Sequence, residues 1–245
     1  MRTKVFILAA GLGTRLKDLT ADKPKALVLI NGKPMLEHLI IKLKAQGFNY
    51  FVINVHHFAD KIEDFLKKNG NFNCKIQISE EKDELLDTGG ALLHAKSYFE
   101  DTENILIHNV DIFTDLNLKK LIDYHQQNNA LATLAVYKRD SSRKLFFDGN
   151  MQLFKWKNKN TGEVKIARTS INKLSEFAFS GLHIVNSKIF NHITETGKFS
   201  IIDLYLRLAK TKKIIASESE YSYWFDLGKP ETLSKAENML KNMQL

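Results

Sequence analysis

The stretch KVFILAAGLGTRL, residues 4–16, decides the fold. Its first six residues form a short, mostly apolar run of the kind that makes a buried parallel strand. A loop with two glycines follows directly, and in an open α/β sheet ligands bind beyond the carboxyl ends of the strands. The loop is neither a dinucleotide fingerprint, which needs a third glycine where Leu16 stands, nor a P-loop, which needs Gly-Lys-Ser/Thr. We therefore predict a strand followed by a loop whose backbone N–H groups approach phosphate oxygens.

The rest of the chain continues to alternate short apolar runs with longer amphipathic ones. Predicted strands cover residues 4–9, 50–55, 75–79, 104–108, 131–137 and 178–185. Predicted helices cover residues 34–46, 60–68, 90–99, 116–127, 202–209 and 232–240. A hairpin is expected from residues 143–148 and 151–156 around Gly149-Asn150, with a long polar loop at 157–176. Strands that alternate with helices predict βαβ crossovers, and hence a single α/β domain, residues 1–245, with a mainly parallel sheet and a small hairpin subregion.

Charge narrows the classes of partner. The formal net charge of +8 is compatible with nucleic acid, an anionic membrane or small phosphorylated ligands, and also with solvated basic faces. The excess of positive charge is confined to two segments. Residues 1–33 contain seven basic and two acidic residues, and residues 138–173 contain ten basic and three acidic residues. We find no nucleic-acid-binding module and no apolar run of the roughly twenty residues that a membrane span needs. We therefore expect no nucleic acid and no membrane, and the single cysteine, Cys74, fits a reducing cytoplasm.

Two cations accompany the glycine loop. Arg15 ends the Gly-Leu-Gly-Thr-Arg motif, and Lys25 follows ten residues later in a Pro-Lys pair. If the chain doubles back, both reach the same loop. Arg presents a planar fork for two phosphate oxygens, whereas Lys acts as a point charge. Together with the glycines, they favour a polyphosphate site over solvated surface charges.

This combination resembles the sugar-1-phosphate nucleotidylyltransferase family, which has a Gly-x-Gly-Thr-Arg loop followed by a Pro-Lys pair. The resemblance extends over nearly the whole chain. Four later segments match the family's order of motifs, namely residues 87–91, 109–111, 179–182 and 224–228. It implies a Rossmann-like three-layer α/β/α fold of the nucleotide-diphospho-sugar transferase type. Residues 1–137 would form the nucleotide-binding half, and residues 138–245 the sugar-phosphate-binding half.

The resemblance also implies the site. Asp111 and Asp226 are expected to hold Mg²⁺, which is bound by one or two carboxylates and keeps places for water and phosphate oxygens. Arg15 and Lys25 are the expected catalytic cations. The expected nucleotide-binding residues are Leu8, Ala9, Ala10, Gly11, Gly13, Thr14, Arg15, Lys25, Thr88, Gly89 and Gly90. The expected sugar-phosphate-binding residues are Asn109, Lys157, Ser180 and Gly181.

The chain departs from the family at two places. Val110 stands where a glycine commonly precedes the first metal-binding aspartate, and Lys155-Trp156-Lys157 replaces a Glu-Lys pair that grips the sugar phosphate. Asp115 is a rival metal ligand, although its place before a predicted helix favours an N-cap. We interpret the acidic run as a solvated loop; its members are Glu80, Glu81, Asp83 and Glu84.

The implied reaction is the Mg²⁺-dependent transfer of a nucleoside monophosphate from a nucleoside triphosphate to a sugar 1-phosphate, with release of pyrophosphate. Within the family, the compact length and the Asp-Thr-Gly-Gly loop favour UTP and N-acetylmuramate 1-phosphate, a step of cell-wall peptidoglycan recycling. Transfer of GMP to mannose 1-phosphate is the alternative, and transfer of CMP to choline phosphate is a third. The alternative from another class is a nucleotide-binding regulatory module without catalysis, motivated by Val110. The predicted protein is a monomer or a homodimer.

Overall fold

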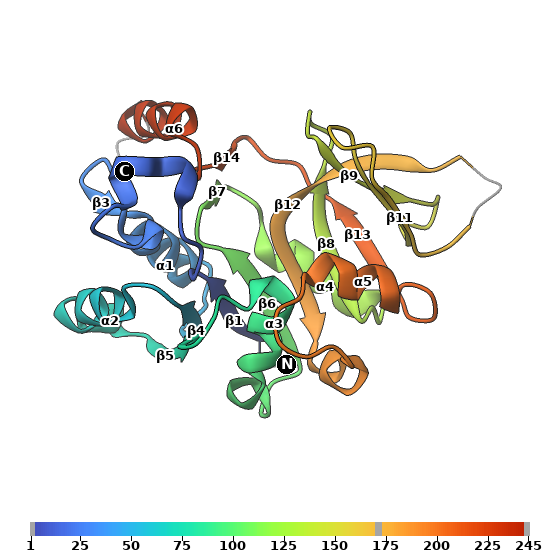
Figure 1. Cartoon of the computed structure of the whole chain (residues 1–245), viewed down its shortest axis with the longest axis horizontal. Helices are drawn as coiled ribbons and strands as arrows, with labels where there is room; N and C mark the ends of the chain where they lie inside the picture. The colour runs from blue at the N-terminus through green and yellow to red at the C-terminus, as the bar shows by residue number, and fades with distance from the viewer. Residues whose placement is uncertain (1–2, 170–172, 243–245) are drawn as a thin grey trace. The chain divides into compact units, whose positions relative to one another are not determined.

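The computed structural model describes residues 3–169 and 173–242, and the chain divides into two compact units (Figure 1). The first unit contains Leu86–Ile107 and Leu116–Glu220, with Thr3 at its start. The second unit contains Lys4–Leu85, His108–Asp115 and the chain from Tyr221 onward. Each unit is therefore assembled from segments that are far apart in the sequence. The predicted halves, 1–137 and 138–245, assign substrates to parts of the chain, and that assignment stays a prediction.

The second unit is built on parallel strands, as the apolar runs predicted. Strand β1 (Thr3–Leu8) pairs in parallel with β4 (Tyr50–Val55), and β4 pairs in parallel with β5 (Lys75–Glu80). Helix α1 (Met35–Ala45) precedes β4, and α2 (Ala59–Lys68) follows it. The interiors of β1 and β4 are fully buried, which explains why both read as continuous apolar runs.

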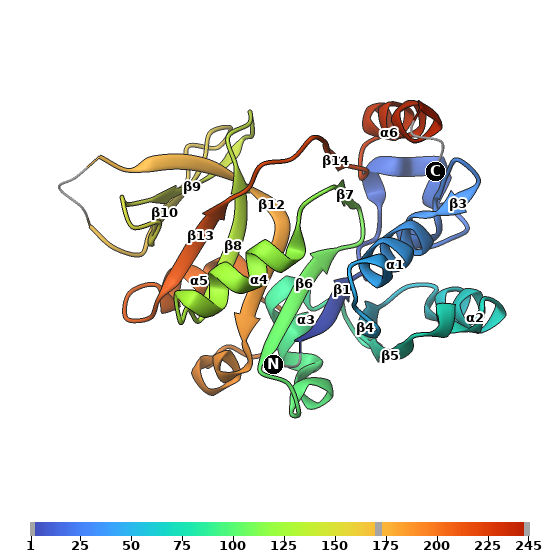
Figure 2. The same ribbon diagram turned by 180° about the vertical axis from the view of Figure 1, so that it is seen from behind.

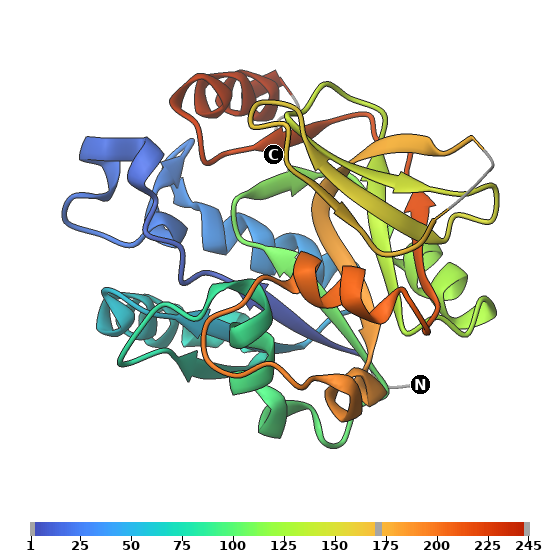
Figure 3. The ribbon, with the colours of Figure 1, turned by 45° about the vertical axis from the view of Figure 1, so that its right-hand side comes forward.

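Residues from the first and the last forty positions of the described chain meet in a hydrophobic cluster of the second unit. Helix α6 (Pro230–Asn242) contacts β14 (Trp224–Asp226) and β2 (Leu29–Ile30), and β14 leads directly into α6 (Figures 1 and 3). The buried members of the cluster are Leu16, Val28, Ile30, Met35, Phe113, Leu227, Leu233, Ala236 and Leu240. The short elements of this unit are η1 (Thr14–Thr20), η2 (Lys25–Leu27), β3 (Lys33–Pro34), η3 (Gly70–Asn73) and β7 (Ile112–Thr114). The cluster supports the glycine loop, because Leu16 lies directly after it.

The first unit contains a mixed sheet with helices on both faces. Strand β8 (Ala132–Tyr137) pairs antiparallel with β12 (Ser175–Asn186) and parallel with β13 (Ile214–Glu218). Helices α4 (Leu118–Gln127) and α5 (Ile201–Leu208) cover opposite faces of these strands, as Figures 1 and 2 show from the two sides. The other elements are α3 (Asp87–His94), η4 (Lys96–Phe99), β6 (Asn104–Asn109) and η5 (Ser187–His192).

The predicted hairpin is present, whereas the predicted long loop is wrong. Strands β9 (Arg143–Phe147) and β10 (Leu153–Asn158) pair antiparallel. Residues 157–176 were expected to be irregular, but β10 continues to Asn158, β11 (Val164–Ile166) pairs with it, and β12 begins at Ser175. These strands lack a clear apolar–polar alternation, because lysines occupy paired positions in them. Lys155 pairs with Ile166, and Lys157 pairs with Val164.

No helix among residues 3–169 and 173–242 is both long enough and apolar enough to cross a membrane.

Candidate functional site

The glycine loop leaves the sheet at Leu8 and contains one constrained and one unobstructed glycine. Gly13 has a φ of +67°, and a Cβ there would lie 2.8 Å from Thr20 Cγ2, so both the backbone and the packing require glycine. Its carbonyl oxygen accepts from the Leu16 N–H at 2.8 Å as η1 begins at Thr14. By contrast, a Cβ on Gly11 would meet nothing within 4 Å. Space is therefore open beside the backbone where the phosphate oxygens are expected.

The two predicted catalytic cations each face one of the two predicted metal ligands. Lys25, which is 8% exposed, donates a short hydrogen bond from its ammonium to Asp111 Oδ2. Arg15 Nη1 lies 3.7 Å from Asp226 Oδ2, and the Arg15 side chain is largely exposed. The four side chains that the motifs singled out thus form two ion pairs within the second unit.

A two-stranded ribbon brings the two aspartates together. Strand β7 pairs antiparallel with β14, with Asp226 opposite Ile112. The next residue, Leu227, donates its N–H to the carbonyl oxygen of Asp111 at 2.8 Å. Asp111 thus directly precedes β7 at the end of the ribbon where Asp226 closes β14, so the two residues lie close together, as the resemblance implied.

Gly228 lies at the centre of these charged groups. A Cβ built on it would lie 2.8 Å from Arg15 Nη2, 2.8 Å from Lys25 Nζ and 2.9 Å from Asp226 Oδ1. Its N–H donates to Asp226 Oδ1 at 2.9 Å, which orients that carboxylate. Glycine is needed here for space alone. The two cations and the two carboxylates at this site carry equal and opposite formal charge.

Asp115 is not an N-cap, which corrects the sequence-based interpretation. The cap of α4 is Asn117, whose Oδ1 accepts from the Lys120 N–H at 3.1 Å. Asp115 instead accepts from the N–H groups of Ser222 at 3.0 Å and Tyr223 at 3.3 Å. Burial raises the pKa of Asp115, but the hydrogen bonds from Ser222 and Tyr223 outweigh it and lower the pKa overall. Asp115 thus holds the segment that leads into β14.

A half-buried lysine on α1 contacts the same ribbon. Lys42 Nζ donates to the Tyr223 hydroxyl at 3.0 Å and lies 5.1 Å from the centre of the Phe113 ring. Burial lowers the pKa of Lys42 to about 8, against the opposing effect of Asp115. His108, the last but one residue of β6, is buried, and this burial lowers the pKa of the His108 imidazole to about 4.

In the first unit, the predicted nucleoside-contacting residues Thr88, Gly89 and Gly90 pack against the segment that leads into α5. The N–H groups of Gly89 and Gly90 donate to the carbonyl oxygen of Phe199 at 2.9 and 3.2 Å. A Cβ on Gly89 would collide with the Phe199 ring at 2.4 Å, and one on Gly90 with Gly197 O at 2.3 Å. Thr88 Oγ1 accepts from the Ile201 N–H at 3.0 Å, at the start of α5. Packing within the unit thus accounts for both glycines, and their contact with a nucleoside stays a prediction.

The predicted sugar-phosphate residues lie on three strands. Ser180 is fully buried, and Gly181, with a φ of +79°, lies where the β8–β12 register shifts. Lys157 lies on β10 opposite Lys144 and is half-buried. Asn109 ends β6 and belongs to the second unit. Their roles toward a sugar phosphate stay predictions.

The predicted acidic loop is wrong at two residues, because Glu80 ends strand β5 and is half-buried, and Glu81 is buried. Asp83 and Glu84 are exposed as expected, but Glu81 is 2% exposed and accepts a hydrogen bond from Asn54 Nδ2 at 2.6 Å. Sequence reasoning missed both Asn54 and Gly228. The signal for Asn54 was a polar residue within the apolar strand 50–55, since a buried amide needs hydrogen-bond partners.

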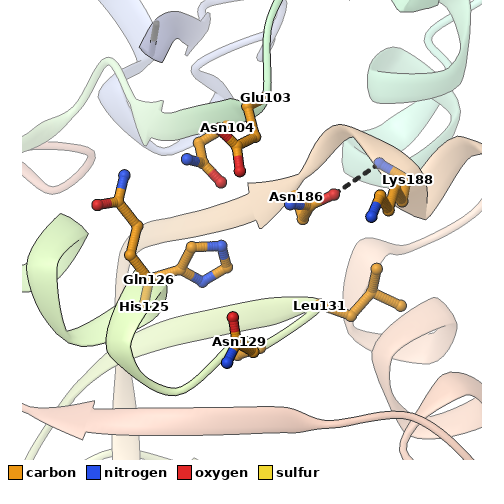
Figure 4. Close-up of a pocket in the computed structure, with 9 residues that line it drawn as sticks. Glu103, Asn104, His125, Gln126, Asn129, Leu131, Asn186 and Lys188 are labelled. Carbon is orange, nitrogen blue, oxygen red and sulfur yellow. Dashed lines mark hydrogen bonds between the residues drawn. The ribbon is translucent and has the colours of Figure 1, made fainter. Parts of the chain in front are cut away.

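A separate polar pocket of about 250 Å³ contains none of the predicted site residues (Figure 4). Asn104, His125, Asn129, Asn186 and Lys188 are among its lining residues. Asn104 begins β6, so the pocket lies at the amino end of that strand. Substrates of α/β folds bind at the carboxyl ends, so this pocket is not the candidate site.

The two aspartates fit Mg²⁺ that shares its ligands with a phosphate. No cluster of three or more His, Cys, Asp or Glu side chains able to hold a metal occurs among residues 3–169 and 173–242. A metal cage made wholly by these residues is therefore absent. Two carboxylates at the end of one ribbon match the one or two that Mg²⁺ takes beside phosphate oxygens.

The chain is similar to known proteins over almost its whole length. The family model described as "Nucleotidyl transferase" matches residues 4–243. The N-acetylmuramate alpha-1-phosphate uridylyltransferase of Caulobacter vibrioides is 28% identical, over 96% of each chain. The mannose-1-phosphate guanyltransferase of Aspergillus oryzae is 26% identical, but this chain covers only 61% of it.

Solved structures show the same fold. HddC from Yersinia pseudotuberculosis has a TM-score of 0.79 and 30% sequence identity, covering 98% of this chain and all of that one. A second structure of HddC is complexed with GMP-PN. The likeness confirms the predicted Rossmann-like α/β fold with a mainly parallel central sheet. The chain belongs to the nucleotidyl transferase family, which confirms the resemblance to sugar-1-phosphate nucleotidylyltransferases that its motifs indicated.

Proposed function

We propose that this protein transfers a nucleoside monophosphate from a nucleoside triphosphate to a sugar 1-phosphate and releases pyrophosphate. The observation that carries the proposal is the arrangement of Arg15, Lys25, Asp111 and Asp226 around Gly228. Family membership supports it, since the matched relatives include sugar-1-phosphate uridylyl- and guanylyltransferases. UTP with N-acetylmuramate 1-phosphate is the first substrate pair, because the relative with that activity matches the chain over almost its whole length.

The chemical difficulty of this reaction is the meeting of two polyanions. An oxygen of the sugar phosphate attacks the α-phosphorus in line, and the bond to the β-phosphate breaks as pyrophosphate leaves with the electron pair. No covalent intermediate with the protein is needed, so positioning and charge neutralisation account for the catalysis.

Each cation has a distinct task toward the triphosphate. The N–H groups of residues 11–14 donate to phosphate oxygens, and the space beside Gly11 is open for them. Arg15, exposed beside them, binds the outer phosphates with its guanidinium fork. Lys25 is buried and held by Asp111, so its ammonium is fixed near the α-phosphate and the attacking oxygen.

The charge balance at the site supports the use of a divalent cation. Arg15 and Lys25 are paired with Asp226 and Asp111, so these four groups together bring no surplus positive charge to a triphosphate. The two carboxylates would hold Mg²⁺, which supplies Lewis acidity and a template for the two phosphates when bound.

The decisive experiment is a pyrophosphate-release screen of the four nucleoside triphosphates, each with Mg²⁺, against N-acetylmuramate, N-acetylglucosamine, mannose and glucose 1-phosphates. Asp111→Asn, purified in parallel, should lose the activity while keeping its fold. Asp83→Asn, an exposed aspartate of the same unit, is the matched control and should keep it. Release by Asp111→Asn at the wild-type rate would refute the assignment, and no release from any wild-type mixture would refute the proposed reaction.

A guanylyl transfer to mannose 1-phosphate or a similar hexose 1-phosphate is the second candidate. It is favoured by the HddC structure complexed with GMP-PN and by the guanyltransferase relative. The same screen separates the two candidates by base and sugar. A regulatory module without catalysis would bind a triphosphate and release no pyrophosphate. A role in cell-wall recycling and a cytoplasmic location, which the single cysteine supports, belong to the first candidate.

A further inference from the structure

Two buried polar side chains connect the carboxyl ends of the parallel strands in the second unit. Asn54, the last but one residue of β4, is 3% exposed. Its Oδ1 accepts from the backbone N–H of Ala9 at 2.6 Å and of Ala10 at 3.4 Å. These are the first two residues after β1, where the chain enters the glycine loop. The start of the loop is therefore hydrogen-bonded to the neighbouring strand through a side chain.

Glu81 sets the orientation of that side chain. Its Oε1 accepts from Asn54 Nδ2 at 2.6 Å. A carboxylate only accepts, so the amide nitrogen of Asn54 must face Glu81, and its oxygen must face the loop. The reversed amide would turn its NH₂ toward two backbone N–H groups and lose all three hydrogen bonds.

Glu81 is itself held firmly at the end of β5. Its N–H donates to the Val55 carbonyl oxygen at 2.8 Å, and its carbonyl oxygen is hydrogen-bonded to His56 Nδ1 at 2.6 Å. Burial of a carboxylate is costly unless it is hydrogen-bonded, and the hydrogen bond from Asn54 offsets part of that cost. With exposures of 2 and 3%, neither Glu81 nor Asn54 presents its polar atoms to a ligand in solution.

We propose that Asn54 and Glu81 are positioning residues for the phosphate-binding loop, with Glu81 acting through Asn54. Asn54 holds Ala9 and Ala10, so the N–H groups of Gly11 to Thr14 keep a fixed direction toward the phosphates. This inference rests on the proposed function in that the ligand of the loop is a nucleoside triphosphate. Loss of the Glu81 hydrogen bond should weaken triphosphate binding by roughly tenfold or more, the range for a hydrogen bond to a charged group.

The test reverses the polarity of the pair. Asn54→Asp keeps the size of the side chain and its ability to accept from Ala9, but it places two carboxylates against each other. Adding Glu81→Gln turns the second residue into a donor, which restores a hydrogen bond to Asp at position 54 with the roles exchanged. Glu81→Ala removes the partner altogether. Thr133→Val is the control, because it removes a buried hydrogen bond to His125 in the first unit.

Two readouts are needed, namely the Kd of UTP and of GTP with Mg²⁺ by calorimetry, and amide hydrogen exchange of residues 9–14. Asn54→Asp and Glu81→Ala should weaken triphosphate binding and speed exchange in the loop, while the KM for the sugar 1-phosphate stays within about twofold. The double variant should recover most of both effects, and Thr133→Val should change neither.

A double variant no better than Asn54→Asp, or unchanged loop exchange and affinity in Glu81→Ala, would overturn the inference. If Glu81→Ala does not fold, the comparison of Asn54→Asp with the Asn54→Asp, Glu81→Gln double variant decides alone. If the wild-type protein releases no pyrophosphate, the proposed function fails, and the exchange comparison still decides whether Asn54 and Glu81 order the loop.

Discussion

Replacing Gly228 with alanine tests the geometry of the site with a single methyl group. The new carbon would lie 2.8 Å from Arg15 Nη2, 2.8 Å from Lys25 Nζ and 2.9 Å from Asp226 Oδ1. Ordinary contacts to a carbon are about 3.5–4 Å, so each group has to retreat by roughly 1 Å. The φ of Gly228 is not positive, so alanine adds no backbone strain there.

The effect on activity should be much larger than the effect on stability. Arg15 and Lys25 meet the methyl group with the far ends of flexible side chains, so the fold accommodates it by moving them. A displacement of about 1 Å in a catalytic group can cost about 100-fold in rate. We therefore expect kcat/KM to fall by about 100-fold, or about 2.7 kcal/mol of transition-state stabilisation, with little change in Tm.

Gly149→Ala is the matched control for this measurement. Gly149 lies in the turn between β9 and β10, its φ is also not positive, and a Cβ there meets nothing within 4 Å. Steady-state pyrophosphate release and thermal unfolding should be measured for both variants. A folded Gly228→Ala protein that keeps kcat/KM within about threefold of wild type would show that these charged groups do not form the reacting centre.

Three further changes probe the loop, the buried cation and the core. Gly11→Ala should raise the KM for the triphosphate by roughly tenfold without lowering Tm, because its Cβ occupies open space beside the loop; unaltered binding kinetics would show that no phosphate lies there. Lys25→Ala should lower kcat by roughly 10²–10³, the range for one preorganised donor, and an unaffected kcat would remove it from the mechanism. Burial lowers the pKa of His125 from 6.5 to about 4, so the unfolded state takes up a proton that the folded state excludes. The free energy of unfolding should therefore fall by up to roughly 3 kcal/mol from pH 6.5 to 4, and urea titrations of His125→Leu should show a shallower fall; an identical slope would contradict this.

The elements that the sequence predicts well are those whose burial is continuous. The strand over residues 50–55 was predicted with its observed bounds, because its core positions are apolar on both faces of the sheet. The strand β11 (Val164–Ile166) was missed because it is short, and because both Val164 and Ile166 are exposed. Its pairing partner supplies the hydrogen bonds that make it a strand, and pairing leaves no local pattern in the sequence.

The charged part of the site was identified without its geometry. Motifs pointed to Arg15, Lys25, Asp111 and Asp226, but nothing local indicates that β7 and β14 pair. Those strands have three residues each, too few for a periodic signal. The need for glycine at position 228 is likewise not visible in the sequence, because it comes from the charged side chains that crowd around it.

The burial of a polar residue is hard to predict from its sequence neighbours, but a polar residue within an apolar strand does predict buried hydrogen-bond partners. Glu81 stands in an acidic run and reads as solvated, but it is buried and accepts a hydrogen bond from Asn54. Asn54, in contrast, interrupts an apolar strand near its carboxyl end. A buried amide has both a donor and an acceptor to satisfy, and the edge where it lies faces the loop of the neighbouring strand. The acceptor oxygen finds backbone N–H groups in that loop, and the donor nitrogen then requires an acceptor from the next strand along the sheet, which is where Glu81 follows β5. A single polar residue in an otherwise apolar parallel strand thus predicts a pair, and the pair predicts which loop is held in place.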